Sequence, residues 1–388
     1  MPFVITETDR AAFRRCRRQW DFGARTRQNL ERARQPAVPD LDRALRDALA
    51  VYYYPGMWDW DRGVRLPLVS QGFERAMARQ REKCGEDADP RAWQNQLDAG
   101  LALLARYVEW APALDRFAPV LTEPEYEVTV LDPARQTTGL VTASGEAVRY
   151  RGRIDLMAVD GQDAYWIVRH RLVDEDWAAI EELAADEDAI TACWAWEQFY
   201  IGMAITGTIW NELRWPSPAT PDPDRPRRTP WRLPRIRRRS GGQPAVRQHE
   251  PSGGGRSIPQ HRRMYAQARQ PRRAAPVEQH VSPEFRRTWL RHGPAEIAAA
   301  GRRLGTDVAE MTRDDLAVVP SPSDRHCRAC PFKEPCQAML AGQDAGRILS
   351  SQYRERPPDI LEEGRLGGGA WSVGRGAAPP RFRSSEGR

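Results

Sequence analysis

The stretch that decides the fold reads Val148-Arg-Tyr-Arg-Gly-Arg-Ile-Asp-Leu-Met-Ala-Val-Asp-Gly-Gln-Asp-Ala-Tyr-Trp-Ile-Val-Arg-His-Arg171. Apolar and polar side chains alternate from Val148 to Ala158, and this period of two predicts a half-buried strand. Asp160 and Gly161 then predict a tight turn, because glycine tolerates a positive φ. The apolar run that follows predicts a buried central strand. Together they predict a β-hairpin at the centre of an α/β fold.

Polar side chains stand at defined places on this hairpin. Asp155 lies inside the first predicted strand, and Arg169, His170 and Arg171 end the second. Burying such groups without partners costs free energy, so a polar cluster on central strands favours a functional site. The alternative is a surface ion pair between Asp155 and one of the two arginines.

The order Gly152-Arg-Ile-Asp155, a turn and then Tyr165-Trp-Ile-Val resembles the core of the PD-(D/E)XK nuclease superfamily. The most similar branch is the RecB type, which includes the iron–sulfur exonucleases of CRISPR adaptation. The resemblance implies a restriction-endonuclease-like core, in which helices flank a central mixed sheet. It also implies a metal-dependent deoxyribonuclease, with exonuclease activity expected.

The same resemblance implies which residues would act. In that family two strand carboxylates hold Mg²⁺ or Mn²⁺, and a lysine orients the attacking water. Asp155 matches the first carboxylate, whereas Arg169 stands at the second and Arg171 stands at the lysine. Arginine stays protonated and cannot act as a base, although it can clamp a phosphate. The catalytic set Asp155, Arg169 and Arg171 is therefore degenerate.

A second metal ligand is expected on the preceding strand. The strand predicted at 120–131 places Glu123, Glu125 and Glu127 on one face. Family members often carry a metal-binding Glu on this strand, and the resemblance assigns that role to Glu125, beside Asp155. The alternative is that the three acids mark a solvated face.

Other family positions are also replaced. Arg46, on an amphipathic helix, stands where relatives commonly have a metal-binding His, and Asp188 and Cys193 lie close to the positions of a family Gln and Tyr. A missing carboxylate could come from Asp174, Asp176 or Asp188. Two hypotheses follow and leave enzyme activity open. One is a nuclease with a rearranged site, and the other is an inactive nuclease-fold protein that binds DNA or a protein partner.

The most specific motif is His326-Cys327-Arg-Ala-Cys330-Pro-Phe-Lys-Glu-Pro-Cys336. Clustered thiolates in a reducing cytosol favour a soft metal, and three ligands are one short of the usual four. Cys16 is the natural fourth ligand. The arrangement resembles the iron–sulfur staple of RecB-type nucleases, which implies a [4Fe-4S] cluster on Cys16, Cys327, Cys330 and Cys336. The alternative is Zn²⁺ on the same thiols, or with His326 replacing Cys16.

Composition limits the partners and the location. The 388-residue chain has a formal net charge of +6 and a pI of about 9.1, which fits an anionic partner such as DNA. The N-terminus does not resemble a signal peptide, and apolar runs are too short to span a membrane. A cytoplasmic protein without membrane association is expected, with its cysteines reduced. The oligomeric state is left open.

The predicted organisation is one domain with an insert. Residues 1–215 would hold the N-terminal Cys helix, a helical region and the nuclease-like core. Residues 216–281, rich in Pro and Arg, predict a disordered insert. Residues 282–345 would complete the same domain with helices, the first starting at Ser282, and with the cysteine cluster. Residues 364–388 predict a disordered tail.

Overall fold

The computed structural model describes residues 2–34, 38–84, 88–174, 176–216 and 278–357. Contacts divide the chain into two units, Met1–Pro216 with Pro276–Arg388, and Ser217–Ala275. The second unit, most of the predicted insert 216–281 and the predicted tail 364–388 lie outside the described residues. The fold is therefore described for the first unit.

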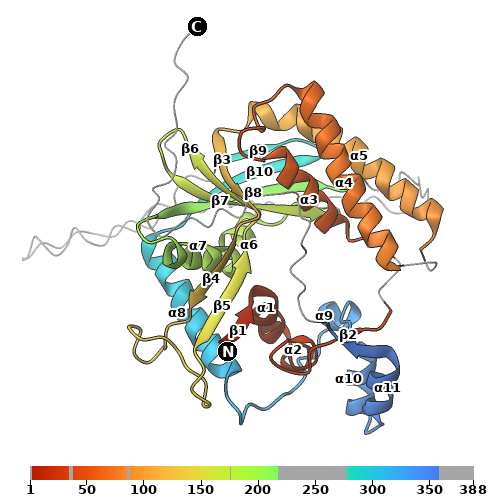
Figure 1. Cartoon of the computed structure of the whole chain (residues 1–388), viewed down its shortest axis with the longest axis vertical. Helices are drawn as coiled ribbons and strands as arrows, with labels where there is room; N and C mark the ends of the chain where they lie inside the picture. The colour runs from red at the N-terminus through yellow and green to blue at the C-terminus, as the bar shows by residue number, and fades with distance from the viewer. Residues whose placement is uncertain (1, 35–37, 85–87, 175, 217–277, 358–388) are drawn as a thin grey trace, which may run out of the picture. The chain divides into compact units, whose positions relative to one another are not determined.

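A six-stranded mixed sheet forms the centre of this unit (Figure 1). Strands β7 and β8 run parallel, and the other neighbouring pairs run antiparallel. In spatial order the strands are β3 (Phe117–Thr122), β6 (Leu156–Asp160), β7 (Tyr165–Val173), β8 (Ile205–Arg214), β10 (Phe285–Arg291) and β9 (Glu278–Val281). The predicted hairpin is β6–β7 and lies inside the sheet, as expected.

Helices cover both faces of this sheet (Figure 1). One face packs on α3 (Leu41–Tyr52), α4 (Arg62–Cys84) and α5 (Pro90–Trp110), which a short 3-10 turn, Ala111–Ala113, follows. The other face packs on α1 (Glu7–Arg15), α7 (Glu187–Phe199) and α8 (Pro294–Met311), while the short α6 (Ile180–Ala184) precedes α7. Leu156 faces the first core and Met157 the second, because strand side chains alternate. The expected class, an α/β fold with a mixed sheet flanked by helices, is confirmed.

A smaller sheet continues the hairpin and changes one prediction. It contains β1 (Phe3–Thr6), β5 (Val148–Arg153) and β4 (Glu125–Thr129), with β5 in the middle. The single strand predicted over 148–158 is therefore two strands, β5 and β6, in different sheets. The strand predicted over 120–131 is likewise divided between β3 and β4.

The two breaks lie opposite each other and form one bend. The N–H of Glu123 donates to the carbonyl of Asp155 at 2.9 Å, and the N–H of Ile154 donates to the carbonyl of Pro124 at 3.2 Å. Glu123 has a φ of 47°, and Pro124 has no N–H to give a ladder. Because of this bend, Asp155 lies at the junction of the two sheets.

The turn of the hairpin also differs from the prediction. The positive φ, 59°, falls on Asp163 and not on Gly161. The carboxylate of Asp160 accepts the N–H groups of Gln162 at 2.8 Å and Ala164 at 3.0 Å. An aspartate side chain that bonds its own following backbone stabilises a longer turn than a two-residue one.

The helix predicted from Ser282 is wrong. Phe285–Arg291 is strand β10, paired with both β8 and β9, and the helix α8 starts only at Pro294. The sequence pattern misled because Arg286 and Arg287 are buried and paired with acids inside the sheet. Glu278–Val281, at the end of the predicted insert, forms the strand β9.

Segments from both ends of the chain pack together. Strand β2 (Leu30–Arg32) pairs antiparallel with β11 (Tyr353–Glu355), beside α2 (Arg17–Gly23), α9 (Asp324–Arg328), α10 (Lys333–Leu340) and α11 (Ala345–Gln352). Phe22, Phe332 and Tyr353 form a small core there. Cys16 is extended, with a φ of −164°, between α1 and α2. The predicted N-terminal Cys helix is therefore two helices, which meet at Cys16.

In the described part of the chain, no helix combines the length and the apolar character that crossing a membrane requires.

Candidate functional site

A pocket of about 460 Å³ lies at the bend between the two sheets. Its lining brings together three predicted site residues, Asp155, Glu125 and Arg169, but not Arg171. The charged lining consists of the carboxylates of Glu7, Glu125, Asp155 and Asp188 and the guanidinium groups of Arg46, Arg151, Arg153 and Arg169. The pocket is therefore rich in both signs of charge.

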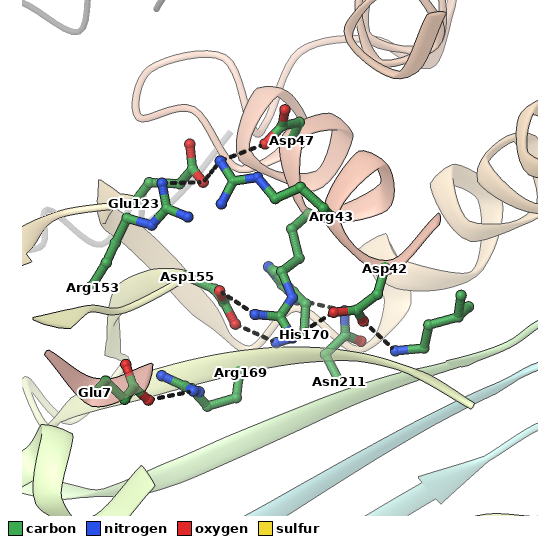
Figure 2. A network of polar contacts seen from close by, with 12 residues as sticks. Glu7, Asp42, Arg43, Asp47, Glu123, Arg153, Asp155, Arg169, His170 and Asn211 are labelled. Atoms are coloured by element: carbon green, nitrogen blue, oxygen red, sulfur yellow. Dashed lines mark hydrogen bonds and ion pairs between the residues drawn. The ribbon is translucent and has the colours of Figure 1, made fainter. Parts of the chain in front are cut away.

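Asp155 is held from two sides (Figure 2). Its Oδ2 accepts the backbone N–H of His170 at 2.8 Å, and its Oδ1 lies 3.6 Å from a guanidinium nitrogen of Arg46. Burial alone raises the pKa of this carboxyl, but Arg169, Arg46 and His170 together bring it below its usual range. Asp155 is therefore ionised and already has cationic neighbours.

Arg169 is paired with a residue that the sequence pattern did not reveal. Its Nη2 donates to Oε1 of Glu7 at 3.0 Å, and the two side chains are only 14% and 21% exposed. Figure 2 shows this pair beside Asp155. Burial raises the pKa of Glu7 although Arg169 opposes the shift. Glu7 lies 162 positions from Arg169, and nothing in the local sequence identifies it as a partner.

Arg171 does not belong to the pocket. Its guanidinium lies 3.6 Å from Glu182 of α6, although it shares the strand β7 with Arg169. Arg171 lies two positions after Arg169, and two residues of a strand span about 7 Å, so the Arg171 side chain starts beyond the bend. The expected place of the family lysine is therefore outside this pocket.

Two lining carboxylates have no hydrogen bond or ion pair with the described residues: Glu125, which is exposed, and Asp188. Burial and the neighbouring Asp186 raise the pKa of Asp188, while Arg10 and Arg169 oppose the shift. Asp174 and Asp176 are exposed and do not line the pocket. Of the three replacement acids that the sequence offered, only Asp188 reaches it.

The other two arginines of the lining, Arg151 and Arg153, already form ion pairs. Arg153 lies 3.4 Å from Glu123, which also meets Arg43 at 3.2 Å (Figure 2). Arg151 pairs with Glu127 at 2.7 Å. The inner cations, Arg46 and Arg169, are thus the ones beside Asp155.

The carboxylates do not converge on a common point. Within residues 2–357 and outside their undescribed gaps, no group of three or more His, Cys, Asp or Glu side chains is arranged to hold a metal ion. At this pocket Glu7 faces Arg169, and Asp155 faces Arg46 and the His170 N–H. One oxygen of Glu7 and both oxygens of Asp155 therefore already have a donor or a cation close to them.

The four cysteines predicted as metal ligands gather in one region. Burial raises the pKa of the Cys330 thiol; Cys16, Cys336 and Cys327 raise it further, and the Phe332 N–H opposes them. All four are free thiols of intermediate exposure. A set of reduced thiols drawn from both ends of the chain suits a soft metal.

Backbone groups already point at two of these sulfurs. The N–H of Ser321 donates to Cys16 Sγ and the N–H of Ser323 donates to Cys327 Sγ, both at 3.4 Å. Such donors stabilise the charge of a thiolate and so favour ligation. Cys193 is buried in α7, where burial raises the pKa of its thiol well above the usual range.

Behind Asp155 lies a buried polar network that the sequence did not predict. His170, 3% exposed, accepts a hydrogen bond at Nδ1 from Asn211 at 3.0 Å and stacks on Tyr53. Arg287 donates to the hydroxyls of Tyr53 at 2.9 Å and Tyr107 at 3.1 Å. Burial lowers the pKa of His170 to about 4, so its ring is neutral. The network fixes β7 against α3 and α5.

Comparisons with known proteins add little. No family model matches the chain, and no curated protein matches it. The crystal structure of a protein called SSO0001 is similar over 86% of each chain, with 11% identity and a TM-score of 0.31. At that TM-score the likeness supports no conclusion about family or activity.

Proposed function

We propose that this chain is a RecB-type PD-(D/E)XK-like protein that binds DNA and holds a phosphate group in the pocket around Asp155. The observation that supports this most is the place of Asp155 at the bend of the central hairpin, with Arg46 and Arg169 beside it. Guanidinium groups bind phosphate oxygens through paired N–H donors. A phosphate bound here would meet fixed cations where the family uses a divalent metal.

The proposal includes a [4Fe-4S] cluster on Cys16, Cys327, Cys330 and Cys336. The four thiolates of such a cluster bind different iron atoms, so they surround a volume and need not converge on one point. Four neighbouring free thiols from both ends of the chain supply the number and the type of ligand that such a cluster takes. When bound, the cluster would link Cys16 to the C-terminal segment and so restrict the unfolded chain.

Metal-dependent DNA cleavage is the second candidate, and one observation favours it. Glu7 and Asp188 line the same pocket as Asp155, and burial raises the pKa of both. A divalent cation would offset that unfavourable charge. Asp155 with Glu7, Asp188 or Glu125 would then hold Mg²⁺ or Mn²⁺, which lowers the pKa of a bound water. This requires the Glu7–Arg169 ion pair to open.

One experiment separates the two candidates. Anaerobically purified protein is incubated with labelled single- and double-stranded DNA, in EDTA and in Mn²⁺, beside the Asp155→Asn variant. The proposal predicts complexes in EDTA and intact DNA in both conditions. Cleavage in Mn²⁺ by the parent but not by Asp155→Asn would establish the nuclease instead. A protein that neither binds nor cuts DNA would contradict both candidates.

A further inference from the structure

We infer that Glu7 is an internal competitor for the phosphate at Arg169: its carboxylate occupies the inner guanidinium of the pocket until an anionic ligand displaces it. This inference rests on the proposed function of the pocket and deepens it. The Glu7–Arg169 ion pair neutralises the guanidinium when no ligand is bound, and its stability sets how tightly an anion binds.

The geometry gives Arg169 one partner that can leave. Its guanidinium meets Glu7 at 3.0 Å inside the pocket lining. Two other acids of the lining lie near it. Asp155 is already bonded to the N–H of His170 and lies beside Arg46, and Asp188 makes no ion pair with it. A guanidinium that is 14% exposed needs an anion at all times, because an unpaired buried charge is costly. An incoming phosphate can take over that role only where Glu7 withdraws.

Glu7 is also placed so that it can withdraw. Burial, together with the nearby carboxylates of Asp188 and Asp155, disfavours its charged form. The start of α1 does not depend on it, because Thr6 and Asp9 form a reciprocal capping box, with the Asp9 N–H donating to Thr6 Oγ1 at 3.1 Å. The Glu7 side chain can therefore move while the helix stays in place.

The test uses two matched variants, each of which removes the acidic partner of an arginine on β7. Glu7→Gln removes the acid that pairs with Arg169, and Glu182→Gln removes the acid that pairs with Arg171 outside the pocket. Each removes one negative charge and frees one arginine of β7. The probe is a 5′-phosphorylated thymidine dinucleotide in EDTA, titrated by calorimetry. Its small size limits contacts with residues 217–275, which all variants share.

Glu7→Gln should bind the dinucleotide about tenfold more tightly than the parent, because it removes the fraction of molecules in which the site is closed. Glu182→Gln should stay within about twofold of the parent. Glu7→Asp, whose shorter side chain reaches Arg169 less well, should fall between the parent and Glu7→Gln. If Glu7→Gln does not fold, the affinity of Glu7→Asp for the dinucleotide is compared with that of the parent instead.

The outcomes distinguish this inference from the proposed function. If Glu7→Gln and Glu7→Asp bind no more tightly than Glu182→Gln, while Arg169→Gln abolishes binding, Glu7 does not compete and the phosphate site stands. If Glu7→Gln tightens binding equally in an Arg169→Gln background, the gain is general electrostatics and the inference is overturned. If no variant binds the dinucleotide or DNA, both fail.

Discussion

Asp155 is as much a structural residue as a candidate functional one. It accepts the N–H of His170 and neutralises part of the charge of Arg46 and Arg169. Asp155→Ala would leave the buried His170 N–H without its acceptor and would remove one of the anions beside Arg46 and Arg169, so we expect it to lower the free energy of unfolding by about 3 kcal/mol. Asp155→Asn keeps an acceptor and should cost about half as much. Urea unfolding measures both.

The exposed Asp98→Asn on α5 is the control, and it should stay within about 0.5 kcal/mol of the parent. If Asp155→Ala were as mild as this control, the contacts of Asp155 would contribute little to stability. An inactive Asp155→Ala protein must therefore be checked for folding before its loss of function is interpreted.

Stability should also depend on pH through His170. Its native pKa is about 4, below the value near 6.5 of an unfolded histidine. Between these values the unfolded state binds more protons, so stability falls as the pH drops from about 6.5 to 4, by about 3 kcal/mol. The depressed pKa of Asp155 adds a further loss at still lower pH, where its carboxylate is protonated.

Thermal unfolding across this pH range tests the assignment. His170→Gln, which stays neutral and can still accept from Asn211, should flatten the dependence above pH 4. His280→Gln on the edge strand β9 lies outside the network and should retain the slope. Equal slopes in all three proteins would show that His170 does not titrate as described.

The sequence located part of the site at this scale. Asp155, Glu125 and Arg169 do meet in one pocket, because they lie on strands whose period could be recognised. Glu7 could not be found in this way, since an ion pair between distant segments leaves no local pattern. The prediction that Arg171 belongs to the site was wrong. The alternation of residues along a strand shows which face of the sheet a side chain lies on, but it does not show how far along the strand the pocket extends.

At the scale of elements, the bend between β5 and β6 positions the pocket. The alternation of apolar and polar residues in the sequence continues through the bend. It therefore predicted one strand, whereas the structure has two strands in different sheets. Gly152 was the available signal, because a glycine inside a strand often marks a close approach or a bend. A Cβ on Gly152 would lie 2.2 Å from the hydroxyl of Tyr126.

Gly152→Ala should therefore destabilise the protein by about 2 kcal/mol, through overpacking under the pocket. Gly161→Ala in the same hairpin is the matched control, because nothing lies within 4 Å of its Cβ position. Tyr126→Phe should restore part of the loss, since it removes the atom in closest conflict. Chemical denaturation of the three variants checks this, and equal stability of the two alanine variants would contradict it.

On the scale of the whole molecule, cysteines from both ends of the chain lie in one region. Anaerobic preparation should give about four iron and four sulfide per chain if the cluster forms. Cys16→Ser should lose the iron and lower the melting temperature, whereas Cys84→Ser should keep both, since Cys84 is not among the thiols near Cys330. Zinc without sulfide in the parent would support the alternative metal.

Charge is unevenly distributed along the chain. Residues 217–275 contain 15 arginines and 3 acidic residues, whereas the whole chain has a net charge of only +6. The rest of the chain is therefore net negative. The basic pI predicts an anionic partner, but overall composition does not reveal that residues 217–275 carry the excess positive charge. Nonspecific DNA affinity and its salt dependence should come mainly from 217–275.

The central claim is that the pocket around Asp155 holds a phosphate through Arg169 without a divalent metal. The most direct test compares Arg169→Gln with Arg171→Gln, two residues apart on β7, for binding of a 5′-phosphorylated oligonucleotide in EDTA. Arg169→Gln should weaken binding at least about tenfold, and Arg171→Gln should leave it within about twofold. Equal effects of the two variants, or binding that requires a divalent metal, would contradict the claim.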